Sequence, residues 1–394
     1  MFAAAWSWVE LCDWLPAVLT GNDRPDAMRR GVCAAGHKAM FAEDWGGLPD
    51  AEFLASLDPD LAALRGRLYA EAFPAETPAG TLSREWAEKT GLREGTVVAV
   101  GAFDAHMGAV GAGVGEGTLV KILGTSTCDI MVQPANRPVD DIPGVCGIVK
   151  GSVLGGYFGI EAGQSAVGDI FLWFVDNLVP ESWGKTTGEK FAALEASAAK
   201  LAPGQSGLLA LDWNNGNRTV LVDQRLTGLL IGQSLRTRPD EIYRALIEAT
   251  AFGALRIIER IEEHGVPVRA VVNCGGLADK NDLLMRVYAD VTGRPMRVAR
   301  SAQTCALGAA LFGAVAAGRF VSVEEAQAAL CGVREREYRP DPERAAAYGE
   351  LYALYRRLHD AFGTTEWNGN LHDIMKRLLD IRDRAAARAG QPVV

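Results

Sequence analysis

Residues 101–108, Gly-Ala-Phe-Asp-Ala-His-Met-Gly, place a single carboxylate, Asp104, directly after an apolar run. Residues 96–101 are β-branched and apolar, which predicts a buried strand that delivers Asp104 to an edge of a sheet. Enzymes with α/β folds hold their chemistry at strand ends. Asp104 is therefore a candidate general base, although an aspartate in this place is also typical of a helix N-cap or a turn.

A second segment could hold an anion. Residues 124–127, Gly-Thr-Ser-Thr, combine flexible backbone N–H groups with three hydroxyls and carry no bulky side chain. Such a segment can approach a phosphate closely, because glycine and small residues leave the backbone accessible. An ordinary hairpin turn explains the same residues. The two segments together predict a base that faces a nucleotide.

A strand that ends in two glycines forms a third candidate site. Residues 268–274 read as a strand running into Gly275 and Gly276, and a helix is expected over residues 282–292. A turn at a helix N-terminus suits a phosphate or an adenine ring, since backbone N–H groups point at the ligand there. The pattern is neither a P-loop nor a dinucleotide-binding fingerprint.

Other elements must position these segments. Apolar residues at helical spacing predict an amphipathic helix over residues 240–264, with Gly265 as its stop. Short β runs with glycine punctuation predict a mixed sheet from strands at residues 118–123, 129–132 and 155–160. The small residues of 306–318 predict a helix packed closely on a sheet.

The first part of the chain alternates helix-like and loop-like stretches. Residues 1–14 predict an amphipathic helix that ends near Pro16, and not a signal peptide, because a basic n-region is absent and acidic residues interrupt it. Asp58 and Pro59 mark a second helix start, with the aspartate as cap and the proline in the first turn.

Composition indicates a globular chain and excludes several classes of function. The 394 residues are 48% hydrophobic and 23% charged, with a net charge of −9. That charge argues against nonspecific nucleic-acid or membrane partners, and we expect a soluble, cytoplasmic protein. The seven cysteines are odd in number and scattered, so neither a disulfide framework nor a zinc site is predicted.

The order and spacing of several motifs resemble those of the FGGY carbohydrate kinases, and within them the bacterial ribulokinase group. The matching segments are residues 33–40, 101–108, 124–127, 159–165 (Gly-Ile-Glu-Ala-Gly-Gln-Ser) and 274–277 (Cys-Gly-Gly-Leu). The resemblance implies an α/β fold of the actin and hexokinase-like (ribonuclease H-like) sugar kinase type with two domains, the first incomplete. Residues 1–112 would be the remainder of the N-terminal, sugar-side domain. Residues 113–394 would form the C-terminal, nucleotide-side domain with its C-terminal helices.

The resemblance also implies that the family's opening segment belongs upstream of Met1. Family members open with a strand, an Asp-x-Gly-Thr phosphate loop and a first half-domain, none of which occurs in this sequence. We therefore expect a truncated gene model or a gene fragment. The family's principal magnesium-side carboxylate would lie in that loop.

The resemblance assigns a role to individual residues. Asp104 matches the catalytic aspartate, the general base that takes a proton from the sugar hydroxyl. Lys38 and Glu161 match side chains that contact the sugar. The nucleotide-binding residues would be Gly124, Thr125, Gly168, Gly275, Gly276 and Asn281.

Some residues depart from the family pattern or keep two interpretations. Leu172 and Lys280 stand where relatives carry a glutamine and an asparagine, so the adenine contacts need not transfer. His37 and His106 flank Lys38 and Asp104; each could orient its neighbour, but a packing role is favoured. The polar loop of residues 212–218 resembles a ribulokinase segment and has no assigned chemistry.

The activity implied is transfer of a phosphoryl group from MgATP to a primary hydroxyl of a ketopentose, with L-ribulose converted to L-ribulose 5-phosphate. ATP and Mg²⁺ are the expected cofactors, and Mg²⁺ would arrive with the nucleotide, without a dedicated protein metal site. A kinase for another pentulose or a polyol is an alternative. A catalytically inactive nucleotide-binding or interaction fragment is another, and homo-oligomerisation is left open.

Overall fold

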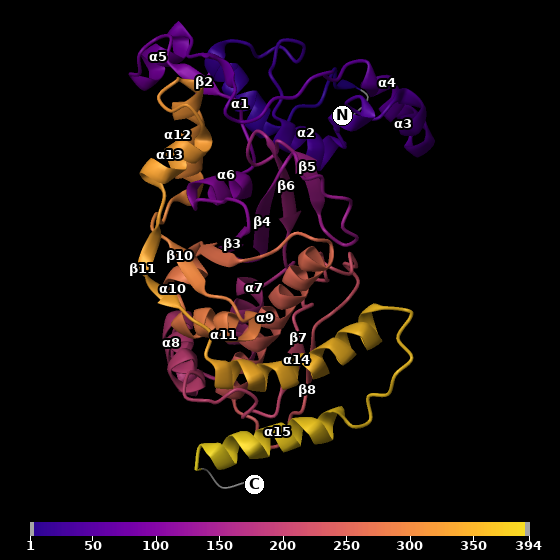
Figure 1. Cartoon of the computed structure of the whole chain (residues 1–394), viewed down its shortest axis with the longest axis vertical. Helices are drawn as coiled ribbons and strands as arrows, with labels where there is room; N and C mark the ends of the chain where they lie inside the picture. Colours follow the sequence, from indigo (N-terminus) through magenta and orange to yellow (C-terminus); the bar gives the residue numbers. More distant parts are fainter. Residues whose placement is uncertain (1–3, 391–394) are drawn as a thin grey trace.

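The structure is a computed structural model that describes residues 4–390. Its centre is a seven-stranded mixed sheet in the order β11-β10-β9-β3-β4-β6-β5. The strands are β3 (Thr118–Leu123), β4 (Thr127–Pro134), β5 (Gly147–Lys150), β6 (Tyr157–Ala162), β9 (Ala270–Cys274), β10 (Met296–Ala299) and β11 (Val333–Tyr338). Helices cover both faces of this sheet (Figure 1). The predicted α/β class is confirmed.

The sheet changes strand direction at β3. Strand β9 runs parallel to both β3 and β10, whereas β4 pairs antiparallel with β3 and with β6. Along β3 the side chains alternate between the faces: Leu119 and Leu123 join one apolar cluster, and Val120 joins another. This period of two explains why the sheet has a separate core on each face.

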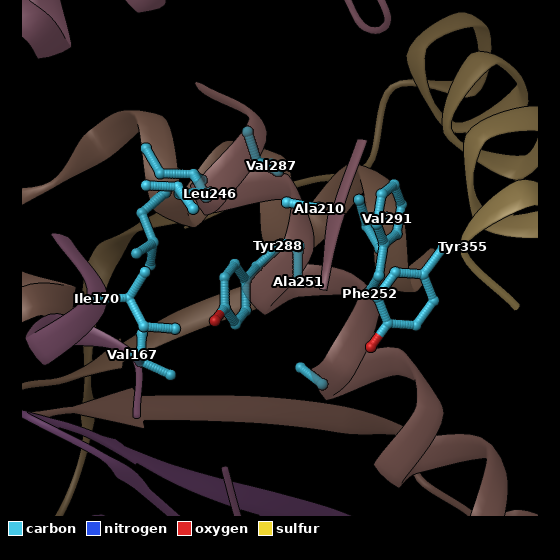
Figure 2. Close-up of a cluster of buried hydrophobic side chains, with 14 of the residues drawn as sticks. Val167, Ile170, Ala210, Leu246, Ala251, Phe252, Val287, Tyr288, Val291 and Tyr355 are labelled. Carbon is cyan, nitrogen blue, oxygen red and sulfur yellow. The ribbon is translucent and has the colours of Figure 1, made fainter. Parts of the chain in front are cut away.

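The larger core lies between the sheet and helices that alternate with its strands in sequence or follow its last strand. These are α7 (Gly168–Leu178), α8 (Thr187–Ala198), α9 (Pro239–Glu263), α11 (Asp282–Thr292) and α14 (Pro342–Gly363). Figure 2 shows part of this core, in which the Phe252 ring of α9 lies 5.3 Å from that of Tyr355 in α14. Helix α9 is the predicted amphipathic helix, and Gly265 follows it with a positive φ of 81°. Helix α11 spans the residues predicted for it.

The opposite face carries α6 (Asp104–Gly111), α12 (Thr304–Ala316) and α13 (Val323–Leu330). A Cβ atom on Gly308 would lie 1.9 Å from the Met107 carbonyl oxygen, and one on Gly111 would lie 2.0 Å from that of Thr304. These glycines let the two helix backbones touch. The small-residue helix therefore makes its closest backbone contact with another helix, and it also contacts the strand Val97–Ala99 and shares an apolar cluster with strands of the central sheet.

The elements before α6 form the opposite end of the molecule from the C-terminal helices (Figure 1). They are α1 (Leu11–Thr20), α2 (Val32–Ala39), α3 (Ala51–Leu57), α4 (Pro59–Arg65), α5 (Arg84–Thr90), β1 (Pro78–Thr81) and β2 (Val97–Ala99). Strand β2 is only half-buried and pairs with β1 in a separate two-stranded sheet, so the prediction of a buried strand here is wrong. The start of α4 is as predicted, with Asp58 accepting a bond from the Asp60 N–H.

The helix predicted for the first residues begins and ends later than expected. Helix α1 starts at Leu11, continues through Pro16 and stops before Gly21; the first three predicted residues lie outside the described part. Proline lacks the N–H that would bond the Cys12 carbonyl. That carbonyl instead packs against Gly101, where a Cβ atom would lie 1.9 Å from it. This close approach leaves room only for glycine at position 101.

The remaining elements are short, apart from the C-terminal helix. They are the 3₁₀ turns η2 (Glu43–Trp45) and η3 (Glu181–Trp183), the strand pair β7 (Leu209–Leu211) and β8 (Leu229–Ile231), α10 (Gly276–Lys280) and α15 (Ile374–Arg388). Among the described helices, none combines the length and apolar character that crossing a bilayer requires.

Candidate active site

The N-terminus of α6 and the hairpin between β3 and β4 lie at the same end of these two central strands. Helix α6 leads into β3 through residues 112–117, so the chain doubles back on itself. A Cβ atom on Gly108 would lie 3.8 Å from Cγ1 of Ile122, which fixes the two elements side by side. Asp104 is exposed in the first turn of α6 and accepts a bond from the Ala105 N–H. Phe103 is the N-cap, so the capping role considered for Asp104 does not apply.

Lys38 reaches the same region from the end of α2. Its side chain is exposed, and Nζ lies 5.5 Å from the centre of the Phe103 ring, next to Asp104 in sequence. Glu161 projects from β6 and is partly buried. Burial raises the pKa of Glu161, whereas the positive charges of Arg218 and Lys38 lower it. The structure thus brings Lys38 and Glu161 within electrostatic reach of each other.

Two histidines contact Glu161. Oε2 of Glu161 lies 3.6 Å from Nδ1 of His37 and 3.7 Å from Nε2 of His106, and the two Nε2 atoms are 3.2 Å apart. One donor atom from each of the three side chains falls within 4.8 Å of the others, a spacing that a metal ion could use. The sequence showed the histidines only as neighbours of Lys38 and Asp104, because 69 residues separate them.

Arg218 is a functional candidate that sequence reasoning missed. Its Nη2 donates to the Thr127 carbonyl at the base of the hairpin, and its charge lowers the pKa of Glu161. A Cβ atom on Gly163 would lie 2.2 Å from Nη2, so this glycine makes room for the guanidinium. The only signal in the sequence was the polar loop of residues 212–218, whose distance from Thr127 along the chain concealed the contact.

The predicted nucleotide residues gather around the hairpin. Gly124 and Thr125 are exposed, and within the described residues the Thr125 and Ser126 N–H groups donate to no protein acceptor. The Gly168 N–H donates to the Gly124 carbonyl at 3.1 Å, which seats the start of α7 against the hairpin. Two accessible N–H groups beside a helix N-terminus can bind an anion.

The glycine pair after β9 adjoins this hairpin. Gly275 has a φ of 96°, and a Cβ atom there would lie 2.3 Å from the Leu123 carbonyl oxygen. Gly276 is exposed, and a Cβ atom on it would meet nothing within 4 Å. The backbone is therefore pressed against β3 on one side and open to a ligand on the other.

Asn281 lies apart from this open surface. It is buried, caps α11 by accepting from the Leu284 N–H, and donates to the Tyr243 hydroxyl. Its assignment as a nucleotide contact stays a prediction. Leu172 and Lys280, the two departures from the family pattern, are both exposed.

A buried network of polar side chains lies at the base of the hairpin between β3 and β4. Nζ of Lys121 lies 2.8 Å from both carboxylate oxygens of Asp129, its partner across the hairpin. The Thr127 hydroxyl accepts from the Gln164 N–H, and the Gln164 amide in turn donates to Asp212. Because unpaired polar groups are costly inside a protein, these bonds hold the hairpin in one arrangement.

Two hollows adjoin the candidate residues. One, of about 560 Å³, is lined by Asp104 together with apolar residues of α1 and α12, among them Leu15 and Phe312. The other, of about 310 Å³, is lined by Lys38 and by the buried pair Asp13 and Arg30.

Known proteins resemble this chain in sequence. The C-terminal domain of the FGGY family of carbohydrate kinases matches residues 119–317. A ribulokinase of Geobacillus thermodenitrificans is 46% identical over 96% of this chain and 66% of its own length. One from Shouchella clausii is 43% identical over 99% and 69%. The chain thus spans about two thirds of the length of these relatives.

Solved structures give the same fold. The xylulose kinase of Rhodospirillum rubrum has a TM-score of 0.74 at 24% identity and covers 92% of this chain and 70% of its own. The Plasmodium falciparum glycerol kinase with ADP has a TM-score of 0.72 at 15% identity, covering 88% and 66%. At these identities the likeness supports the fold alone. The sequence matches carry the assignment further: the chain belongs to the FGGY family of carbohydrate kinases.

Proposed function

We propose that this chain carries the catalytic base, sugar contacts and phosphate hairpin of a kinase that transfers the γ-phosphoryl group of MgATP to a ketopentose. The observation that carries the proposal is that Asp104 and the open hairpin at Gly124 lie at the same end of the central strands, with Lys38 beside Phe103. L-Ribulose is the proposed substrate, because the relatives from Geobacillus and Shouchella bear the name ribulokinase.

Each group has a distinct part in the proposed reaction. Asp104, exposed in the first turn of α6, accepts the proton of the primary hydroxyl as that oxygen attacks phosphorus. Lys38 and Glu161 bind sugar hydroxyls, one as a donor and the other as an acceptor. The N–H groups of Thr125 and Ser126 bind phosphate oxygens. Positioning and electrostatics of this kind supply most of the catalysis in phosphoryl transfer.

The side chains near Asp104 and the hairpin offer oxygen donors that would suit Mg²⁺. Asp104 offers a carboxylate, and Thr125 and Ser126 offer hydroxyls, which are the hard oxygen donors that Mg²⁺ prefers. Bound with the nucleotide, the ion neutralises charge on the phosphates.

The test is L-ribulose-dependent release of ADP from MgATP, with the Asp104→Asn variant beside the unmodified protein. We expect Asp104→Asn to lower kcat by about 10²–10⁴-fold, since it removes a general base, while the Kd for ATP changes little. Asp60→Asn is a matched control, because Asp60 is also an exposed aspartate in the first turn of a helix. Undiminished turnover in Asp104→Asn would remove Asp104 from the mechanism. Faster turnover of D-xylulose or ribitol would reassign the substrate.

A further inference from the structure

The contact among His37, His106 and Glu161 joins three elements that are distant in sequence. His37 comes from the last turn of α2, His106 from α6 and Glu161 from β6. The side chains of the two histidines are only 5% and 2% exposed, and that of Glu161 is 18% exposed. The carboxylate therefore reaches solvent on one side and is backed by imidazoles on the other.

The backbone is shaped to accept the His37 ring. Gly147 pairs with Glu161 across β5 and β6, and a Cβ atom on Gly147 would lie 2.7 Å from Nδ1 of His37. A Cβ atom on Gly36 would likewise lie 2.3 Å from Cγ1 of Val149 in the same strand. Two glycines thus let α2 press against β5 and bring His37 to Glu161.

Both imidazoles are neutral at pH 7. Burial lowers the pKa of His37 to about 4, with a further contribution from Lys38. Burial also lowers the pKa of His106 to about 3, with a contribution from His37. A neutral imidazole carries one N–H and one acceptor nitrogen. In the Nε2-to-Nε2 contact one ring must therefore donate and the other accept, which leaves two possible arrangements of the protons.

One of the two possible orders fits the surroundings better. If His106 donates through Nε2, His37 carries its proton on Nδ1, which faces Glu161. The reverse order would turn a lone pair of His37 toward the carboxylate. It would also leave the His106 Nδ1 proton buried without an acceptor, because that nitrogen has no partner. An unsatisfied buried donor is costly, so the first order is favoured.

The same geometry argues against a metal ion as the usual occupant. His37 turns one nitrogen to His106 and the other to Glu161. A metal would need one nitrogen from each ring at about 2.0–2.1 Å and would normally be supported by a partner on the second nitrogen. Nδ1 of His106 lacks such a partner.

We propose that His106 and His37 are positioning residues: His106 Nε2–H donates to Nε2 of His37, the His37 Nδ1–H then faces Oε2 of Glu161 at 3.6 Å, and this polar contact orients the Glu161 carboxylate toward the sugar hydroxyls. This inference rests on the proposed kinase function. One oxygen of Glu161 is occupied by the histidine pair, and the other remains to accept from the sugar. The pair therefore sets the direction in which Glu161 meets the sugar.

The first test measures the tautomers directly. In protein with ¹⁵N-labelled histidine and no substrate, long-range ¹⁵N–¹H spectra at pH 7 should show His37 protonated on Nδ1 and His106 on Nε2. A His37 protonated on Nε2 would overturn the inference whatever the activity. Zn²⁺ that binds with micromolar affinity and displaces these signals would also overturn it, in favour of a metal site.

The second test separates sugar binding from chemistry. Gln in place of His37 puts its amide where Nε2 was, whereas Asn puts it near Nδ1. We expect His37→Gln and His106→Leu to raise the sugar KM about three- to tenfold, with kcat and the ATP KM within about twofold, because a polar contact with a charged group is lost. His37→Asn and His106→Gln retain the donors and should restore most of the affinity.

Two further variants complete the design. Gly147→Ala crowds His37 without removing any polar group and should reproduce the higher sugar KM. His264→Gln alters an exposed histidine and should leave every parameter unchanged. If Asn and Gln at position 37 behave alike, the positioning order is wrong. If the unmodified protein turns over no ketopentose while the tautomers are as stated, the proposed function fails, whereas the assigned proton positions of the two histidines hold.

Discussion

Asp13 and Arg30 form a buried ion pair that lines the same hollow as Lys38. Their side chains are 3% and 2% exposed, and the Asp13 carboxylate also accepts from the Gly31 N–H at 2.7 Å. Desolvation outweighs these partners and raises the pKa of Asp13 from 3.8 to about 6. The charges lie 3.9 Å apart, too far for a strong hydrogen bond, which explains why burial prevails.

A pH dependence of stability follows. Asp13 binds a proton more tightly in the folded state, so it favours folding at low pH, and this contribution is lost as pH rises from about 3.8 to about 6. The slope is at most about 1.4 kcal/mol per pH unit. Urea unfolding at several pH values should show that Asp13→Asn removes this decrease. An unchanged pH profile in the variant would contradict the assignment.

At the scale of elements, the contact between α6 and α12 holds Asp104 in place. Helix α6 is short and begins at Asp104 itself, so its position depends on the helix beside it. Gly111 and Gly308 allow backbone contact between the two, and α6 also packs on β3 and β4 through the apolar cluster of that face.

Crowding this contact should impair both stability and turnover. Gly308→Ala is expected to cost about 1–3 kcal/mol, because its new methyl group would overlap the Met107 carbonyl, and to lower kcat by displacing Asp104. Gly313→Ala in the same helix is the control, since nothing lies within 4 Å of its added Cβ atom. Thermal unfolding and ADP release measure the two effects. Equal behaviour of the two variants would show that the contact is dispensable.

The sequence predicted elements well where local signals were strong. Helices α9 and α11 have clear periodicity and glycine stops, and β3, β4 and β6 are marked by turn residues, whereas β5 was not predicted. Helix α1 was misjudged because Pro16 usually ends a helix, whereas here the helix continues through it to Thr20. Asp104, Lys38 and Glu161 could be found by motif. Arg218 and the histidine pair could not, since their roles depend on contacts between distant segments.

At the scale of the whole molecule, burial is unevenly distributed. The central sheet is covered on both faces, and its larger cluster extends from β3 to α15. Among the elements from α1 to β2, a small separate cluster includes Val32, Ala35, Phe41 and Leu48, and Cys33 of α2 joins the core that contains α6. The boundary predicted at residue 112 remains a prediction, but α6 lies on its near side and shares a core with β3 and β4 on the other.

Hydrogen exchange should reflect this distribution. We expect amides of β9 and α9 to exchange at least about 100-fold more slowly than those of α2 to α5, because few buried contacts oppose opening of the N-terminal elements. Exchange followed by mass spectrometry at pH 7 measures it. Protection of α6 should match that of β3. Uniform protection along the chain would mean that the whole molecule opens as one unit.

The backbone contacts at Gly31, Gly101, Gly111 and Gly308 have a consequence for mutational tolerance. At each, any side chain would lie within 2.5 Å of a carbonyl oxygen on another segment. A scan of all substitutions should therefore find these positions as intolerant as Asp104, although they touch no ligand. Intolerance in this protein will mark where chain segments touch as sharply as where chemistry occurs, and only assays that separate abundance from turnover will tell the two apart.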